Sequence, residues 1–373
     1  MLKSFAVTNF RLFEKKVTLD FSQIGNYDYN IDCIKDNCVK TAIMYGDNAG
    51  GKSSIAFALF DIVTSLTDNY TNIQKYINYL NNQGSNPLAT FEYIFNFNGK
   101  DIKYEYKKSS VSSFVSEKLI LDDIVLLDYD KSKNENNLVI NIPGTETLSR
   151  NLEKIDISVL KYIKSNAVFK HGEVTDILLK LFNFVDKMLL FWSLENRSFV
   201  GYETNVTNDI ISNIVANNTF DDLKAFFKTA GFTDNLIHSN IGGTEKLYIK
   251  YPNGKILSFY DASSTGMSSL LLVFYWLQNI KDENKSPSFI MIDEFDAFYH
   301  FKLSRYVIQE LKKCKCQVIV TTHNTSLMKN DILRPDCYYI CSKEKILNLT
   351  NSTKKDIKEW DNLENLYKGG TFG

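Results

Sequence analysis

Arginine is scarce in this sequence, and no charge of either sign is in excess. The 373 residues contain five arginines, at positions 11, 150, 197, 305 and 334, so lysine is the usual cation. The 43 basic and 44 acidic side chains leave a net charge of −1, which does not indicate a nucleic-acid or membrane partner. A basic face within this neutral total stays an open alternative.

Paired metal-binding cysteines and a clear membrane span are also lacking. The six cysteines fall as Cys33/Cys38, Cys314/Cys316 and Cys337/Cys341. None of these spacings is the C-x-x-C of a zinc site, and we find no signal peptide, so we expect reduced thiols and a cytoplasmic protein. The longest uncharged run, 262–280, begins with small polar residues, which favours a buried helix over a membrane span.

Hydrophobic periodicity predicts an α/β fold. Strand-like alternation occurs at 3–10, 15–21 and 91–108, the last with a turn at Asn98-Gly99, and the apolar run 42–45 predicts a buried strand. A helix is predicted for 53–66, helical patterns fill about 150–227, including 174–194, and strand–helix alternation returns from 256. We therefore predict a mixed sheet flanked by helices, with N-terminal antiparallel strands. We predict that the chain has three parts: 1–130 and 251–373 form the N-terminal and C-terminal parts of this α/β unit, and 131–250 form a mainly helical insert between them.

A glycine-rich loop follows the buried strand at 42–45. The run GDNAGGKSS matches G-x-x-x-x-G-K-[ST], with Gly46, Gly51, Lys52 and Ser53 at the fixed positions. Glycines permit a tight loop whose amides point inward, the lysine can reach phosphate oxygens, and the hydroxyl can hold Mg²⁺. The loop with the helix after it predicts a site for a nucleotide phosphate.

Two later strands end in chemically active side chains. The strand SFIMI is followed by Asp293 and Glu294, and the strand QVIV is followed by two threonines and His323. A strand-end aspartate can hold a metal, and the next carboxylate can orient an attacking water. Taken alone, Asp293-Glu294 could simply begin a solvated loop, and His323 could simply begin a helix. Their order along the chain, after the glycine loop, favours the functional interpretation.

A fourth signal is ASSTGMSS, which precedes the apolar run LLLVFYWL. Ser264 and Gly266 lie where a helix would begin, so backbone donors there could bind a second anion. Ordinary capping of the helix by serine is the alternative.

Along the chain the order is the glycine loop, the helix start ASSTGMSS, the strand with Asp293-Glu294 and the strand with His323. In this order, the four motifs resemble those of an ABC-type ATPase head, most closely of the SMC/RecF-like branch. VTNFRLF is similar to the opening strand of that branch, and YGDNAGGKSS to its phosphate loop. IDEFDAFYHFKLS, TTHNTSLM, LRPDCYYI and LYKGGTFG resemble the AAA-family ATPases related to OLD (overcoming lysogenisation defect) proteins, including ATPase subunits of abortive-infection and PARIS-type anti-phage systems. Both ends of the chain carry the resemblance, whereas 119–246 matches only loosely.

The resemblance implies a role for each matched residue. The implied cofactors are ATP and Mg²⁺, with Ser53 and Asp293 at the metal, Glu294 and Lys52 in catalysis, and His323 as the switch that senses the γ-phosphate. Residues implied to bind nucleotide are Arg11, Gly46, Asn48, Ala49, Gly50, Gly51, Lys52, Ser53 and Ser54, with Ser264 and Gly266 in the signature. Asp296 is implied in the dimer-contacting loop. Thr265 and Met267 depart from the usual signature, and the glutamine loop is not assigned.

The resemblance also implies partners. We expect a homodimer that encloses ATP, open to higher assembly, and no membrane partner. OLD proteins carry a fused nuclease, but few residues follow His323 here, so we expect a separate nuclease or toxin effector under the control of a sensor or scaffold subunit. The alternative is a DNA-repair or chromosome-handling ATPase that binds DNA directly. A transporter subunit ranks lower because the interval between Ser53 and Ser264 is long. A non-hydrolysing binding module also ranks lower, because Lys52, Asp293 and Glu294 are all present.

Overall fold

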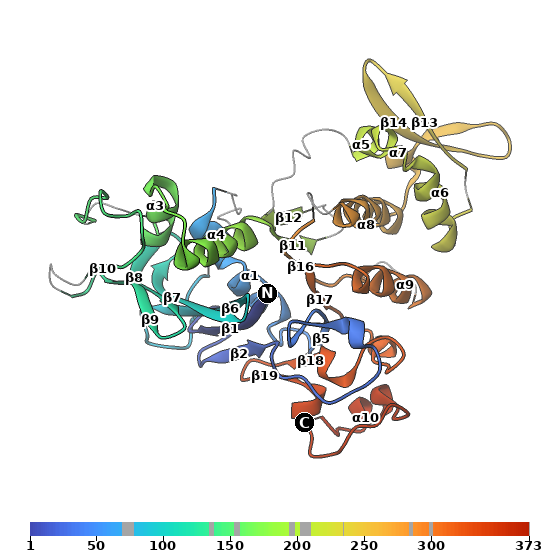
Figure 1. Ribbon diagram of the computed structural model, residues 1–373. Coiled ribbons are helices and arrows are strands. Elements are labelled where there is room, and N and C mark those ends of the chain that lie inside the picture. Colours follow the sequence, from blue (N-terminus) through green and yellow to red (C-terminus); the bar gives the residue numbers. More distant parts are fainter. Residues whose placement is uncertain are drawn as a thin grey trace.

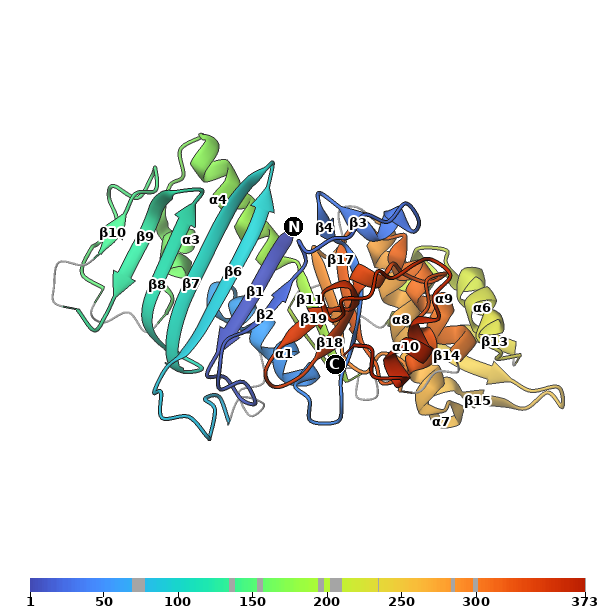
Figure 2. The same ribbon diagram turned by 90° about the horizontal axis from the view of Figure 1, so that it is seen from below.

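The computed structural model describes residues 1–68, 78–133, 138–152, 157–193, 198–201, 210–233, 235–282, 286–297 and 301–372. Two seven-stranded sheets dominate this part of the chain, and they lie side by side in both views (Figures 1 and 2). A three-stranded sheet projects at the end of the molecule opposite the first large sheet. The α/β fold, with its mixed sheet, flanking helices and N-terminal antiparallel strands, is confirmed.

The first large sheet is entirely antiparallel. Its strands, in spatial order, are β10 (Val139–Ile140), β9 (Ile124–Asp130), β8 (Ser113–Leu121), β7 (Lys100–Ser110), β6 (Ala89–Phe97), β1 (Leu2–Thr8) and β2 (Val17–Asp20). β6 and β7 are joined at Asn98 and Gly99, whose φ angles of 56° and 80° suit the tight hairpin turn predicted there. Alternate residues of β6 are buried because one face of this sheet packs on the core.

The second large sheet is mixed and lies at the centre of the molecule. Its order is β12 (Ser198–Gly201), β11 (Met188–Ser193), β16 (Phe289–Ile292), β17 (Gln317–Thr321), β5 (Thr41–Tyr45), β18 (Tyr338–Cys341) and β19 (Ile346–Asn348). The five inner strands are parallel, and the two edge strands are antiparallel to their neighbours. β5, β16 and β17 are buried along their whole length, as expected for parallel strands covered on both faces.

Two smaller sheets and the helices complete the described structure. The smaller sheets are β13 (Asn235–Ile241), β14 (Thr244–Lys250) and β15 (Ile256–Ser258), and β3 (Ile34–Lys35) with β4 (Cys38–Val39). The α-helices are α1 (Lys52–Leu59), α2 (Asp61–Leu66), α3 (Val159–Asn166), α4 (Glu173–Asp186), α5 (Ile210–Ala216), α6 (Phe220–Thr229), α7 (Phe259–Ala262), α8 (Thr265–Lys281), α9 (Phe301–Lys312) and α10 (Leu363–Lys368). Short 3₁₀ helices are η1 (Ile31–Cys33), η3 (Thr325–Leu327), η4 (Pro335–Cys337) and η5 (Leu349–Asn351).

Helices cover both faces of the central sheet. On β11, the ring of Phe191 lies 5.6 Å from that of Trp276 in α8, and the ring of Trp192 lies 5.6 Å from that of Phe57 in α1. Because successive residues of a strand point to opposite faces, α8 and α1 cover opposite faces. The helix predicted at 53–66 is divided at Phe60 into α1 and α2. The run 262–280 forms the buried helix α8, and no helix among the described residues has the length and apolar character to cross a membrane.

The helical pattern predicted for 174–194 is wrong in its last part. α4 ends at Asp186, and Met188–Ser193 form strand β11, which pairs in parallel with β16. A uniformly apolar run such as MLLFWS has no period that separates strand from buried helix. The segment 131–250 thus contains β10 to β14 as well as α3 to α6, and β11 belongs to the central sheet. The three-part division of the chain stays a prediction.

Candidate functional site

Three neighbouring parallel strands bring the predicted site residues together. β17 lies between β16 and β5, and all three run in the same direction (Figure 1). The glycine loop follows β5, Asp293 follows β16, and His323 comes two residues after β17. The carboxyl ends of parallel strands meet at one edge of a sheet, where α/β proteins bind their ligands. Segments far apart in the sequence therefore meet at a single edge.

Two glycines of the loop are required by its geometry. Gly51 has φ 111°, and a Cβ there would lie 2.8 Å from the ring of Phe13. A Cβ on Gly46 would lie 2.5 Å from the backbone oxygen of Cys341 in β18. Side chains at these positions would force the loop open, so glycine is needed both for the left-handed turn and for the close approach.

Lys52 is held beneath the loop by three acceptors. Its Nζ donates to the backbone oxygens of Gly46 (2.9 Å) and Asp47 (3.2 Å) and lies 2.8 Å from His323 Nε2. Because the ammonium can only donate, Nε2 accepts, and the proton of a neutral imidazole is then on Nδ1. Burial lowers the pKa of Lys52. The lysine and the predicted switch histidine are therefore in direct contact.

Ser53 and Asp293 are also in direct contact. Ser53 Oγ donates to Asp293 Oδ2 at 2.6 Å, and the hydroxyl of Thr321 donates to Asp293 Oδ1 at 2.6 Å. Asp293 is buried to 7 % exposure, whereas Ser53 is exposed. Both carboxylate oxygens thus have a fixed partner, one on α1 and one on β17.

The next two acidic residues lie differently from each other. Glu294 is exposed and has φ 47°, and its backbone N–H donates to Thr321 Oγ1 at 2.8 Å. Asp296 is turned inward and accepts from Thr322 Oγ1 at 2.6 Å, and burial raises its pKa. The Glu294 side chain is open to solvent, while Asp296 braces the turn that carries His323. The dimer-contact role of Asp296 stays a prediction.

The other residues predicted to bind nucleotide on this side of the site are Asn48, Ala49, Gly50, Ser54 and Arg11. Gly50 N–H donates to the Asp47 oxygen at 2.9 Å, closing a turn. In this turn Asn48 and Ala49 are exposed, Ala49 has φ 59°, and Ser54 is buried in the first turn of α1. Arg11 lies over α1, its guanidinium carbon 4.3 Å from the ring centroid of Phe57. Contacts of these residues with nucleotide stay predictions.

The predicted signature begins α8. Ser264 is its N-cap and accepts from the backbone N–H of Met267 at 3.3 Å, so the capping alternative is correct for its side chain. Ser264 and Thr265 are exposed, and Gly266 is half-buried. The start of α8, beside α7, lies apart from α1 in both views (Figures 1 and 2). The structure therefore does not bring Ser264 and Gly266 to the glycine loop of the same chain.

The residues at the strand ends suit Mg²⁺ and a phosphate chain. Ser53 Oγ and Asp293 Oδ2 are adjacent oxygen donors of the kind that Mg²⁺ prefers, and substrate oxygens and water complete such sites. No side chain caps the first turn of α1, so its amides are available to an anion. No cluster of three or more His, Cys, Asp or Glu side chains suited to a metal occurs among the described residues.

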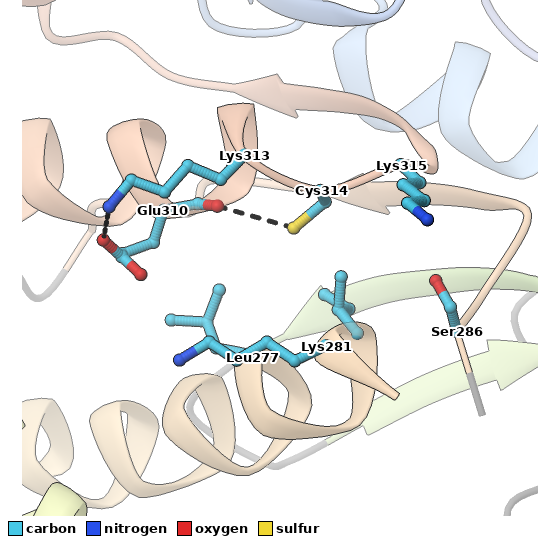
Figure 3. A pocket seen from close by; sticks show the side chains of 8 residues that line it. Leu277, Lys281, Ser286, Glu310, Lys313, Cys314 and Lys315 are labelled. Atoms are coloured by element: carbon cyan, nitrogen blue, oxygen red, sulfur yellow. Dashed lines mark hydrogen bonds and ion pairs between the residues drawn. The ribbon is translucent and has the colours of Figure 1, made fainter. Parts of the chain in front are cut away.

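A hollow of about 330 Å³ lies elsewhere, between the C-terminal end of α8 and α9 (Figure 3). It is lined by Leu277, Ile280, Lys281, Ser286, Glu310, Lys313, Cys314 and Lys315. Lys313 pairs with Glu310, whose backbone oxygen also accepts from Cys314 Sγ. None of the predicted site residues lines this hollow, so it is separate from the strand-end site.

Sequence reasoning missed two residues of the site. Thr321 contacts both acids, and the only signal for it was its place at the end of a strand, before Thr322 and His323. Cys341 lies under the loop, with Sγ 3.7 Å from the Gly50 oxygen, and burial raises the pKa of its thiol to about 12. Nothing in the sequence near Cys341 indicated this contact, because β18 reaches the loop only through sheet pairing.

Comparison with solved structures gives similar chains of low identity. The SMC head domain from Thermotoga maritima is 14% identical, with 93% of this chain and 98% of that chain covered and a TM-score of 0.44. An Smc head with an extended coiled coil, bound to the C-terminal domain of ScpA and derived from Pyrococcus furiosus, is 16% identical, with 94% and 97% covered and a TM-score of 0.46. The recombination mediator protein RecF is 16% identical, with 94% and 98% covered and a TM-score of 0.41.

Comparison with curated proteins gives no match. A family model described as "AAA domain, putative AbiEii toxin, Type IV TA system" matches residues 42–329, well over half of the 373-residue chain. The matched range contains the glycine loop, both strand-end acids and His323. The chain therefore belongs to this AAA-domain family.

Proposed function

We propose that this chain is an ABC-type ATPase that binds ATP with Mg²⁺ at the ends of β5, β16 and β17 and hydrolyses it. The observation that carries the proposal is the pair of contacts Lys52–His323 (2.8 Å) and Ser53–Asp293 (2.6 Å) across these strand ends. A glycine loop with a lysine, a hydroxyl and an aspartate that could hold Mg²⁺, and a further carboxylate that could orient water recur in sites of phosphoryl transfer.

Each residue has a distinct part in the proposed reaction. The loop amides and Lys52 bind the β- and γ-phosphates, and Ser53 and Asp293 would hold Mg²⁺, which neutralises charge on the phosphates. Phosphate oxygens would replace the backbone and His323 acceptors that Lys52 now contacts. Glu294, exposed beside Asp293, orients the attacking water and takes its proton.

Glu294→Gln tests this assignment. The amide cannot take a proton, so we expect ATP turnover to fall by about 10²-fold or more while ATP still binds. Turnover and the Kd of a fluorescent ATP analogue are measured side by side. Glu359→Gln, an exposed glutamate on a C-terminal loop, is the matched control and should behave as wild type. Full turnover in Glu294→Gln would refute the catalytic role.

We further propose that two copies enclose ATP, the loop of one facing Ser264 and Gly266 of the other. The support is geometric, because the start of α8 is exposed and lies apart from α1 within one chain (Figure 2). ATP would place negative charge between two sets of backbone donors, and hydrolysis would remove it.

Ser264→Arg tests this assembly. The bulk of an arginine side chain at the start of α8 should keep the two copies apart and abolish ATP-dependent dimers of the Glu294→Gln chain, measured by light scattering, without changing the Kd for ATP of the monomer. Ser112→Arg, in the exposed turn between β7 and β8, is the control. A Ser264→Arg chain that still dimerises on ATP would exclude this interface.

As a biological role we propose the sensor or scaffold subunit of an anti-phage, abortive-infection system that controls a separate nuclease or toxin. The support is the family description, which names a toxin and a toxin–antitoxin system, together with the resemblance to OLD-related ATPases. Co-expression with the products of neighbouring genes should yield a stable complex and protection from phage. Protection by this chain alone would contradict the separate effector.

A DNA-binding ATPase is the second candidate, and one observation favours it. Lys246 and Lys250 are exposed and lie on the same face of β14, on either side of Tyr248. Direct DNA binding would weaken steeply with salt and would be reduced by Lys246→Glu with Lys250→Glu. Binding that is insensitive to these changes would exclude this face.

A further inference from the structure

We infer that Thr321 is the residue that positions both acids of the site. This role rests on the proposed function. Thr321 is the last residue of β17, is fully buried, and lies between the strand that ends before Asp293 and the strand that leads to the glycine loop. Its hydroxyl contacts both Asp293 and Glu294.

The two hydrogen bonds of this hydroxyl fit its chemistry. A threonine hydroxyl has one proton and two lone pairs. The proton goes to Asp293 Oδ1, 2.6 Å away, and a lone pair accepts the backbone N–H of Glu294 at 2.8 Å. Since the acceptor carboxylate is charged, the bond to Asp293 is of the stronger kind. One side chain therefore satisfies a donor and an acceptor in adjacent residues.

The bond to Asp293 fixes the orientation of the carboxylate. Oδ1 is held by Thr321 and Oδ2 by Ser53, both at 2.6 Å, so rotation about the carboxyl bond would break both bonds. Loss of the Thr321 hydroxyl would leave Oδ1 buried without this donor, and the carboxylate could turn away from Ser53. Metal-binding carboxylates generally need such a partner to hold their direction.

The bond to Glu294 supports an unusual backbone conformation. Glu294 has φ 47°, in the left-handed region that residues with a Cβ seldom adopt. Its N–H is held by the Thr321 hydroxyl, and the next N–H, of Phe295, donates to the Thr321 backbone oxygen at 3.1 Å. Thr321 thus holds this turn at two successive amides, and the Glu294 side chain on the turn is exposed.

Thr41 provides a matched control. It is also a buried threonine, at the start of the adjacent parallel strand β5. In the part of the chain that the structure describes, its Oγ1 has no hydrogen-bond partner. Thr41→Val and Thr321→Val make the same change in the same sheet, so a difference between them reports the hydroxyl contacts of Thr321.

The test compares Thr321→Val, Thr321→Ser and Thr41→Val in the full chain, with and without Mg²⁺. We expect Thr321→Val to lower kcat by about 30-fold or more, because both acids lose their partner, and to change the Kd for ATP without Mg²⁺ less than threefold. Thr321→Ser keeps the hydroxyl and should recover at least a third of the wild-type kcat. Thr41→Val should match wild type in both quantities.

Wild-type kcat in Thr321→Val would overturn the role of Thr321 and leave the proposed ATPase intact. Equal losses in Thr321→Val and Thr321→Ser would overturn it too, since packing rather than the hydroxyl would then be responsible. If Thr321→Val does not fold, Thr321→Cys replaces it, and a Cys variant as active as Thr321→Ser would refute the hydroxyl role. A wild-type chain with no hydrolysis in any assembly would instead refute the proposed function itself.

Discussion

At the scale of single residues, the shape of the glycine loop is the feature most open to test. Gly51 combines φ 111° with a neighbour, Phe13, that leaves no space for a Cβ. Gly99, in the turn between β6 and β7, has φ 80° and nothing within 4 Å of such a Cβ. Both glycines therefore have a left-handed backbone, but only at Gly51 would a Cβ collide with a neighbouring side chain.

We expect Gly51→Ala to destabilise the fold by about 2–4 kcal/mol, the sum of left-handed strain and a steric clash, and to abolish ATP binding. Gly99→Ala should cost only about 1 kcal/mol and leave ATP binding unchanged. Urea unfolding gives the free energies and fluorescence titration gives the Kd. Equal effects of the two substitutions on ATP binding would show that the loop tolerates a Cβ.

Most of the candidate site could be predicted from sequence at this scale. The glycine loop, Asp293, Glu294 and His323 have fixed spacing or follow apolar strands, and sequence shows both properties. Thr321 could not be predicted, because its role depends on a hydroxyl that reaches two acids on the neighbouring strand end. The inward turn of Asp296 toward Thr322 was equally invisible, since sequence does not show which way a loop carboxylate faces.

At the scale of elements, a buried ion pair joins α2 to the antiparallel sheet. Lys108 Nζ on β7 lies 3.0 Å from Asp61 Oδ2 on α2, and both side chains have 0 % exposure. Asp61 also accepts from the hydroxyls of Tyr79 (3.0 Å) and Tyr106 (2.8 Å). Since α2 follows α1, the helix that begins at the glycine loop, this pair ties the segment after that loop to the first sheet.

Removing both charges of this pair should destabilise the fold by less than the sum of the two single changes. Lys108→Met should destabilise the fold by about 3–5 kcal/mol, because a buried carboxylate loses its cation. Adding Asp61→Asn should then cost less than Asp61→Asn does alone, with a coupling of at least about 1 kcal/mol in urea unfolding. The exposed Lys224–Asp221 pair on α6 is the control and should show little effect. Strict additivity would contradict the ion-pair account.

The sequence predicted strands and turns well where the local pattern of residues was sufficient to identify them. β5, β16 and β17 were recognisable as short apolar runs bounded by turn residues, and the β6–β7 turn by Asn98-Gly99. β11 was missed because its strand state is decided by pairing with β16, a partner about a hundred positions later in the chain. Local patterns cannot carry that information.

At the scale of the whole molecule, the two large sheets share one core. The ring of Phe289 on β16 lies 6.2 Å from Phe21, beside β2, and 6.1 Å from Phe60, between α1 and α2. The side-chain amide of Gln317 on β17 accepts from Leu2 N at 3.1 Å and donates to Leu2 O at 3.0 Å. The buried apolar residues of both sheets form a single cluster.

We therefore expect both sheets to unfold together. Hydrogen exchange measured by mass spectrometry across a urea series should give the same midpoint for peptides of β6–β7 and of β16–β17, because neither sheet keeps a separate core. Lys108→Met should lower both midpoints equally. Two distinct midpoints would show that the sheets are independent folding units.

The Ser53–Asp293 hydrogen bond joins residues 240 positions apart, and this has a consequence for how the protein is made. During translation, the glycine loop leaves the ribosome well before the acids and the histidine, because it precedes them in the sequence. A chain that has been translated only through the glycine loop thus carries this loop but lacks Asp293, Glu294 and His323. The Ser53–Asp293 contact can therefore form only after Asp293 has been synthesised, so this site is completed by the later part of the chain.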